Sequence, residues 1–162
     1  AALSSFATPM GRGNHQLLEL AGKQVTLIDD SYNASPASVK ASLQLLGQTG
    51  TGRKLAILGD MLELGKSSPA LHRGLLDTIV ASGIDKIIAV GPHMQHLYAL
   101  LPPEKKAGHY MEVEALFPDI LAHIQAHDTL LVKGSHGTHM FRLVEFLLSS
   151  ANSLHTGFSH AL

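Results

Sequence analysis

The segment from residue 29 to residue 33 reads Asp-Asp-Ser-Tyr-Asn and gathers carboxylate, hydroxyl and amide groups at consecutive positions. It follows residues 25–28, a short apolar run of the kind that forms a buried strand. In open α/β sheets, ligands bind beyond the carboxyl ends of the strands. The segment is therefore a candidate ligand site, although Tyr32 and Asn33 also suit an ordinary turn.

A second polar segment, residues 59–67, reads Gly-Asp-Met-Leu-Glu-Leu-Gly-Lys-Ser and also follows an apolar run. Its ending is like that of a phosphate-binding loop, but five residues separate its glycines, where that loop has four. Asp60 and Glu63 would also place negative charge where backbone N–H groups should meet phosphate. The segment is either a plain strand-to-helix loop or a loop that lines a site for another ligand.

A third segment, residues 133–137, reads Lys-Gly-Ser-His-Gly and lies between an apolar run and a helical pattern. Small residues allow backbone N–H groups to converge at the start of a helix, and such a concavity favours an anion. Lys133 would add a point charge. The alternative is a turn in which Lys133 is solvated.

The elements that position these segments follow from the hydrophobic pattern. Strands are expected at residues 25–28, 54–58, 86–90 and 129–132. Ser35 can cap a helix that begins at Pro36 and places Val39, Leu43 and Leu46 on one face. Further helices are expected over residues 71–79, 93–100 and 117–124 and from about residue 139. Alternating apolar strands and helices predict an α/β fold: a doubly wound, mostly parallel sheet with helices on both faces, Rossmann-like, in a single domain.

Composition narrows the function further. A chain of 162 residues can bury a real core, and 45% hydrophobic and 15% charged residues describe a soluble globular protein. The formal net charge of −1 gives no reason to expect a nucleic-acid or membrane partner. The chain contains no cysteine and no long apolar segment, which favours the cytoplasm.

The histidines do not predict a metal site. There are eleven, and some are spaced three or four residues apart, such as His123 and His127. No pair has the helical His-Glu-x-x-His pattern, and no cysteine pair accompanies them. We therefore expect no native metal site.

Three motifs carry a resemblance to a known family. They are residues 27–36, residues 59–65 with the following Leu71-His72-Arg73, and Lys133-Gly134-Ser135. In order and spacing the chain resembles the carboxy-terminal domain of the Mur ligases over most of residues 11–148. Within the family it is most similar to the members that join D-alanyl-D-alanine to UDP-MurNAc-tripeptide in peptidoglycan synthesis.

The resemblance implies roles for residues in two groups. Contacts to ATP are expected from Arg12, Asp30, Tyr32 and Asn33. The dipeptide is expected to bind at Asp60, Leu62, Lys133, Gly134, Ser135 and His136. Asp60 would hold an ammonium group, and Lys133 with the small residues would hold a carboxylate. His136 stands where family members usually have arginine, which removes a permanent cation. For Arg12, the alternative is a solvated side chain in a flexible turn.

The resemblance also implies a division of labour between domains. Residues 1–10 would be a linker from a central ATPase domain, residues 11–150 the carboxy-terminal domain and residues 151–162 a frayed tail. The start at Ala1-Ala2 fits a fragment. ATP and Mg²⁺ would be held mainly by the central domain, so no catalytic residue and no cofactor are expected in this chain, which alone would be inactive. The partners would be the two substrates and the amino-terminal and central domains of a bacterial cytoplasmic enzyme.

Two alternative functions remain open. One is a related ligase that joins another amino acid or peptide. The other is a signalling receiver domain, in which Asp29 and Asp30 would bind a metal, Asp60 would accept a phosphoryl group and Lys133 would follow the last strand. Against the receiver, Asp60 follows the second predicted strand, whereas the acceptor in receivers follows the third.

Overall fold

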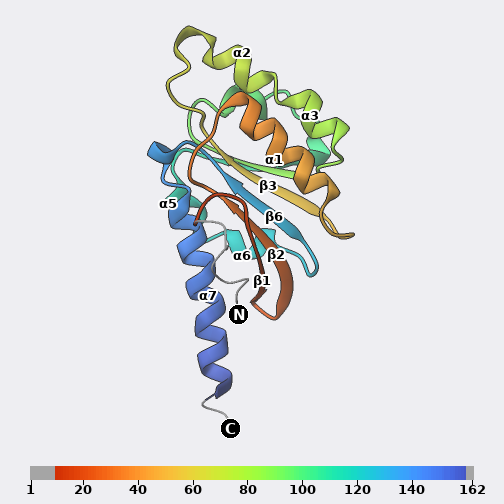
Figure 1. Cartoon of the computed structure of the whole chain (residues 1–162), viewed down its shortest axis with the longest axis vertical. Helices are drawn as coiled ribbons and strands as arrows, with labels where there is room; N and C mark the ends of the chain where they lie inside the picture. The colour runs from red at the N-terminus through yellow and green to blue at the C-terminus, as the bar shows by residue number, and fades with distance from the viewer. Residues whose placement is uncertain (1–9, 160–162) are drawn as a thin grey trace, which may run out of the picture.

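The computed structural model describes residues 10–159 of the chain (Figure 1). The expected linker, residues 1–10, therefore lies outside the described residues except for Met10. Six strands form one mixed sheet in the order β1-β2-β6-β3-β4-β5, in which only the β1–β2 pair is antiparallel. They are β1 (Asn14–Leu20), β2 (Lys23–Asp30), β3 (Lys54–Gly59), β4 (Lys86–Val90), β5 (Lys106–Tyr110) and β6 (Thr129–Lys133).

Helices cover both faces of the sheet, as Figure 1 shows for α1 and α3 on one side and α7 on the other. The α-helices are α1 (Pro36–Gln48), α2 (Ser68–Arg73), α3 (Leu76–Ala81), α4 (Gln95–Tyr98), α5 (Val113–Leu116), α6 (Ile120–His123) and α7 (Phe141–Ser159). Short 3₁₀ turns are η2 (Gly65–Ser67), η3 (Pro103–Lys105) and η4 (His136–Thr138). One hydrophobic core lies between the sheet and α1, α3 and α4, and a second lies under α5, α6 and α7. The predicted doubly wound α/β fold is confirmed.

The first helix forms as its sequence predicts. Ser35 is the N-cap, because its side chain accepts a hydrogen bond from the backbone N–H of Ser38, and Pro36 occupies the first turn. Val39, Leu43 and Leu46 are buried against the sheet. This cap fixes the direction in which the chain leaves the polar segment after β2.

Two strands at the edges of the sheet were missed. In β1 the side chains alternate between the core and solvent, but only Leu18 and Leu20 of the inward-facing positions are apolar. A two-residue turn joins β1 to β2, and both Ala21 (φ 50°) and Gly22 (φ 77°) adopt the left-handed conformation that such turns require. In β5, every residue is only partly buried. Edge strands are buried on fewer sides, so their hydrophobic signal is weak.

Some predicted helices are shorter than expected. The stripe that begins at Leu71 is divided between α2 and α3 around Gly74, and the buried residues of α2 are Ser68 and His72 rather than Leu71. The pattern over residues 117–124 is interrupted at Pro118, which cannot donate a helical hydrogen bond, and α5 and α6 lie on either side of it. Near the carboxyl end α7 continues to Ser159.

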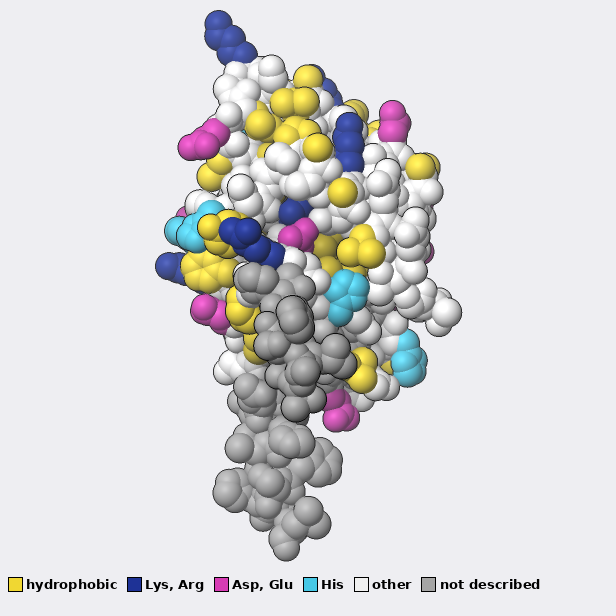
Figure 2. Space-filling model, viewed as in Figure 1, with side chains coloured by type: hydrophobic (Ala, Val, Ile, Leu, Met, Phe, Trp, Pro, Cys, Tyr) yellow, Lys and Arg dark blue, Asp and Glu magenta, His cyan; other side chains and the backbone are white. Residues whose placement is uncertain are grey.

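The parallel strands bring the three polar segments together. The segments follow β2, β3 and β6, which are neighbours in the sheet and point the same way. On the face shown in Figure 2, acidic and basic side chains are interspersed, in keeping with the net charge of −1. None of the helices in the described part of the chain combines the length and the hydropathy needed to cross a bilayer.

Candidate functional site

The two aspartates at the end of β2 point to opposite faces of the sheet, as neighbouring strand residues must. The Asp29 carboxylate is buried and accepts hydrogen bonds from the N–H of Gly11 (2.9 Å), the N–H of Ser31 (3.2 Å) and the hydroxyl of Ser31 (2.6 Å). It therefore fixes the turn that carries Arg12. Asp30 lies on the α1 side, where it accepts a hydrogen bond from the Ser42 hydroxyl.

The four residues expected to contact ATP line one hollow of about 310 Å³, together with Lys133. They are Arg12, Asp30, Tyr32 and Asn33. The Arg12 guanidinium carbon lies 4.0 Å from the centre of the Tyr32 ring, a cation–π contact on an exposed surface. The four side chains therefore share one hollow, and their contact with ATP stays a prediction.

Lys133 is buried rather than solvated. Only 3% of the residue is exposed, and its ammonium group donates to the Asp30 carboxylate and to the Asn33 carbonyl, each at 2.9 Å. The solvated-turn interpretation of Lys133 is therefore wrong. Lys133 joins the ends of β2 and β6 instead.

The loop after β3 is held from three directions. The Asp60 carboxylate, 2% exposed, accepts hydrogen bonds from the backbone N–H of Met94 (2.7 Å) and of His93 (3.1 Å). The Ser135 N–H donates to the Asp60 carbonyl (3.0 Å), and the Ser135 hydroxyl accepts from the N–H of Leu62 (2.8 Å). Ser135 thus connects the loops after β3 and β6, and its hydroxyl already has a protein partner.

Glycines permit these close approaches. A Cβ atom at Gly91 would lie 2.4 Å from the Asp60 carboxylate, and one at Gly134 would lie 3.0 Å from the Cα of Gly59. A side chain at position 91 would displace the Asp60 carboxylate, and one at position 134 would also collide with the Met140 side chain, 2.6 Å away. The glycines therefore set how closely the loops after β3, β4 and β6 pack.

His72 supports the same loop from α2. Its Nε2 accepts the N–H of Met61 (3.1 Å), and its Nδ1 lies 2.7 Å from the Ser68 carbonyl. Because a carbonyl can only accept, Nδ1 carries the proton and the ring is neutral. Burial lowers the pKa of His72 from its ordinary value of 6.5, against the opposing effects of the Ser68 carbonyl and Asp60. The neighbouring His93 and His96 also lower this pKa.

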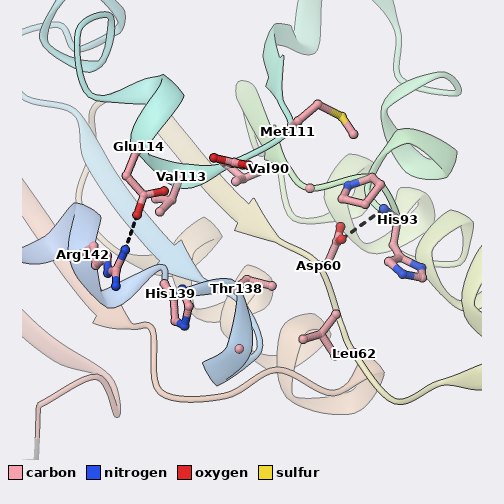
Figure 3. Close-up of a pocket in the computed structure, with 14 residues that line it drawn as sticks. Asp60, Leu62, Val90, His93, Met111, Val113, Glu114, Thr138, His139 and Arg142 are labelled. Carbon is pink, nitrogen blue, oxygen red and sulfur yellow. Dashed lines mark hydrogen bonds and ion pairs between the residues drawn. The ribbon is translucent and has the colours of Figure 1, made fainter.

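A cavity of about 540 Å³ lies beyond this loop, between the ends of β3 and β4, the start of α5 and the start of α7 (Figure 3). Asp60 and His93 lie on one side of it, and the ion pair between Arg142 and Glu114 lies on the other. Leu62, Val90, Met111 and Val113 supply apolar surface. The cavity can therefore take a small ligand with charged groups and short apolar side chains.

The structure divides the residues expected to bind the dipeptide. Asp60 and Leu62 line the large cavity, whereas Lys133 lines the hollow with Arg12. His136 lies edge-on to Tyr32, with ring centres 5.8 Å apart, and lines a third hollow. Gly134 and Ser135 lie beneath the loop.

Sequence reasoning missed Arg142 and the structural role of His72. Arg142 is one helical turn beyond the expected motif and occurs in no pattern of its own. His72 was quoted as part of a motif, but the helical stripe was assigned to Leu71. A shift of that stripe by one residue would have placed His72 on the buried face of the helix.

No group of three or more His, Asp or Glu side chains that could hold a metal ion occurs within the described residues. The receiver alternative does not fit the fold. Counted in chain order, the five parallel strands lie in the order 1-5-2-3-4, whereas receivers have the order 2-1-3-4-5. The buried and doubly hydrogen-bonded Asp60 is also a poor phosphoryl acceptor.

Comparison with known proteins identifies the family. The model of the Mur ligase, glutamate ligase domain, matches residues 16–136. The UDP-N-acetylmuramoyl-tripeptide–D-alanyl-D-alanine ligase of Rickettsia prowazekii is 35% identical over 144 residues, which are 89% of this chain and 31% of that protein. The enzyme of the same name from Bacillus subtilis is 34% identical over 78% of this chain and 28% of its own length.

Solved structures agree. MurF ligase from Thermotoga maritima in complex with ADP matches with a TM-score of 0.73 and 26% identity over 93% of this chain and 33% of its own. MurF from Acinetobacter baumannii matches with a TM-score of 0.73 and 32% identity over 86% of this chain and 31% of its own. The chain thus spans about a third of the length of the relatives it matches. The chain belongs to the Mur ligase family, in which it corresponds to the glutamate ligase domain.

Proposed function

We propose that this chain is the carboxy-terminal domain of a bacterial, cytoplasmic, ATP-dependent ligase that joins D-alanyl-D-alanine to UDP-MurNAc-tripeptide. The observation that carries the proposal is the pair of separate hollows at the carboxyl ends of the parallel strands, one with Arg12 and Tyr32, the other with Asp60 and Arg142. A ligase needs to bring a nucleotide and an amine together. The names of the Rickettsia prowazekii and Bacillus subtilis relatives support this choice of substrates.

The hollow with Arg12 is the nucleotide side of the domain. Tyr32 is 46% exposed, and its ring offers a face for a purine, whereas the amide of Asn33 suits a sugar hydroxyl. Asp30 lines the same hollow and is held in place by Lys133. The ATP itself, with its Mg²⁺ ion, would be bound mainly by the central domain and covered from this side.

The large cavity is the dipeptide side. Its apolar lining suits two short side chains, and Asp60 adds a negative charge near the place of the amine. Ser135 and Gly134 act by shaping the loop that carries Asp60 and Leu62 rather than by touching the ligand. In this arrangement the domain contributes to catalysis by positioning the nucleophile and by excluding water on closure.

The test is the substrate requirement of the complete ligase. ADP formation should require UDP-MurNAc-tripeptide and D-alanyl-D-alanine together, and single amino acids should not replace the dipeptide. ADP formation that depends on a single amino acid would instead support a related ligase. Phosphorylation of Asp60 by acetyl phosphate would overturn the ligase assignment.

The isolated chain provides a second test. It should neither hydrolyse ATP nor join the substrates, since we propose that the carboxylate-activating groups belong to the central domain. The measurement is ADP release by the purified 162-residue chain, with the complete ligase as the positive control. Sustained ADP release by the chain alone would contradict the proposal.

A further inference from the structure

Arg142 is the only lysine or arginine among the described residues that line the large cavity. It is the second residue of α7, and its guanidinium pairs with the Glu114 carboxylate at the start of α5 (Figure 3). About half of each side chain is exposed, 50% for Arg142 and 44% for Glu114. An arginine in this position can reach a ligand in the cavity without leaving its helix.

The ion pair is of a kind that exchanges readily. Solvent-exposed pairs stabilise proteins little, because water competes for both groups. The guanidinium also has more N–H groups than one carboxylate can use. A carboxylate from a ligand can therefore join Glu114 or replace it at small cost.

Other groups that could hold an anion near the cavity are already in use. The Lys133 ammonium is buried against Asp30 and Asn33. The N–H groups of Ser135, Thr138 and His139 donate to backbone carbonyls. Within the expected anion-binding concavity at residues 133–137, the Lys133 ammonium and the Ser135 N–H therefore already have partners in the fold, whereas Arg142 can exchange its exposed partner.

The position of Arg142 at the start of α7 also favours the binding of a carboxylate. The first turn of a long helix carries partial positive charge, which favours a carboxylate there. The hydrogen bond from Arg142 lowers the pKa of Glu114, with a smaller contribution from His139, so an acid at this position is held as its anion. Asp60 lies across the cavity from Arg142, so a carboxylate and a guanidinium line it on opposite sides, although Glu112 and Glu114 also line it. A zwitterionic peptide needs one group of each charge.

We propose that Arg142 binds the terminal carboxylate of the dipeptide and so determines that the ligase accepts a free acid. The proposal rests on the function proposed above and deepens it. The dipeptide carboxylate takes the place that Glu114 occupies in the ligand-free domain, or shares it. Arg142 thereby orients the amine at the other end of the dipeptide away from α7.

The experiment compares D-alanyl-D-alanine with D-alanyl-D-alaninamide as substrates of the complete ligase. For Arg142→Met, KM for the free acid should rise about tenfold or more, the effect of a lost hydrogen-bonded charge pair. KM for the amide, which carries no carboxylate, should stay within about twofold, as should KM for ATP. Arg142→Lys should recover part of the loss, because a lysine keeps the charge but not the paired N–H geometry.

Two further variants make the result decisive. Arg73→Met removes an exposed arginine on α2 that does not line the cavity, and it should change neither KM. Glu114→Gln removes the competing carboxylate, so KM for the acid should stay the same or fall. For Arg142→Met, an equal rise in KM for the acid and for the amide, or no rise in either, would overturn the inference. So would a rise in KM for the acid in Glu114→Gln as large as the rise in Arg142→Met. Within this experiment, the proposed function itself fails if the unmodified ligase does not use D-alanyl-D-alanine, an outcome distinct from all of those above.

Discussion

At the scale of single residues, polar side chains at this sheet edge are divided between those that hold the fold and those that remain open to ligands. Asp29, Ser135 and Lys133 have all found partners inside the protein. Arg12 lies over the ring of Tyr32, and the His136 ring lies edge-on to the same tyrosine, all on an exposed surface. Residue type alone does not separate these two classes, because both contain charged and hydroxyl groups that suit ligands.

Lys133 gives a direct test of this division. We expect Lys133→Met to lower the free energy of unfolding by about 2–3 kcal/mol, because it leaves Asp30 without its cation. The loss should be below the roughly 3–5 kcal/mol of fully buried pairs, since 22% of the Asp30 side chain is exposed. Lys40→Met, on the exposed side of α1, is the control and should cost less than about 0.5 kcal/mol. Equal urea midpoints for the two variants would show that Lys133 is solvated after all.

At the scale of elements, the fold could be predicted wherever a strand is buried on both faces. The strands β3, β4 and β6 are mostly apolar and β2 has a buried centre at residues 25–28, whereas β1 and β5 lie at the edges and have mixed sequences. The ATP candidates could be grouped because three of them are near neighbours after one strand. The residues expected to bind the dipeptide could not be placed together or apart from the sequence. The position of Lys133, for example, depends on its pairing in β6 with Asp30 in β2, and the two residues are far apart in the sequence.

The hydrogen bond from the Met61 N–H to His72 of α2 should make the stability of the domain depend on pH. The pKa of His72 is lowered from 6.5 in the folded protein, so between that lowered value and 6.5 the unfolded chain binds more protons than the folded one. Stability is then complete above pH 6.5 and falls as the pH decreases through this window. His123, whose pKa burial also lowers, acts in the same direction.

His72→Gln should therefore flatten the dependence of unfolding free energy on pH between about 7 and 5, without removing the part that comes from His123. Urea unfolding at a series of pH values measures the slope. His15→Gln, on the exposed side of β1, is the matched control and should keep the slope of the unmodified chain. If His72→Gln kept that slope too, His72 would not be the neutral link between α2 and Met61.

At the scale of the whole molecule, the domain presents Arg12 to whatever covers the sheet edge. The turn around it is fixed rather than flexible: the Gly11 N–H donates to Asp29, the Gly13 N–H donates to the Asp29 carbonyl (2.7 Å), and Tyr32 donates to the Gly11 carbonyl (2.9 Å). The backbone on both sides of Arg12 is therefore hydrogen-bonded, while the Arg12 side chain is exposed. Gly11 (φ 79°) and Gly13 (φ 92°) allow this turn, because both adopt a conformation that other residues rarely take.

A fixed turn that carries an exposed arginine should act on a ligand held by another domain. We predict that Arg12→Ala lowers kcat of the complete ligase by about 10² or more, because the guanidinium would stabilise charge on the phosphates as the domains close. The loss should stay below the roughly 10³–10⁵ of dedicated arginine fingers, since Mg²⁺ and a central-domain lysine would share that charge. Arg12→Lys should recover only part of the lost kcat, because a point charge cannot make two parallel hydrogen bonds.

For Arg12→Ala, the free energy of unfolding of the domain should change by at most about 1 kcal/mol, the scale of an exposed cation–π contact. An unchanged kcat would mean that Arg12 serves only its contact with Tyr32, and a larger loss of stability would make it structural.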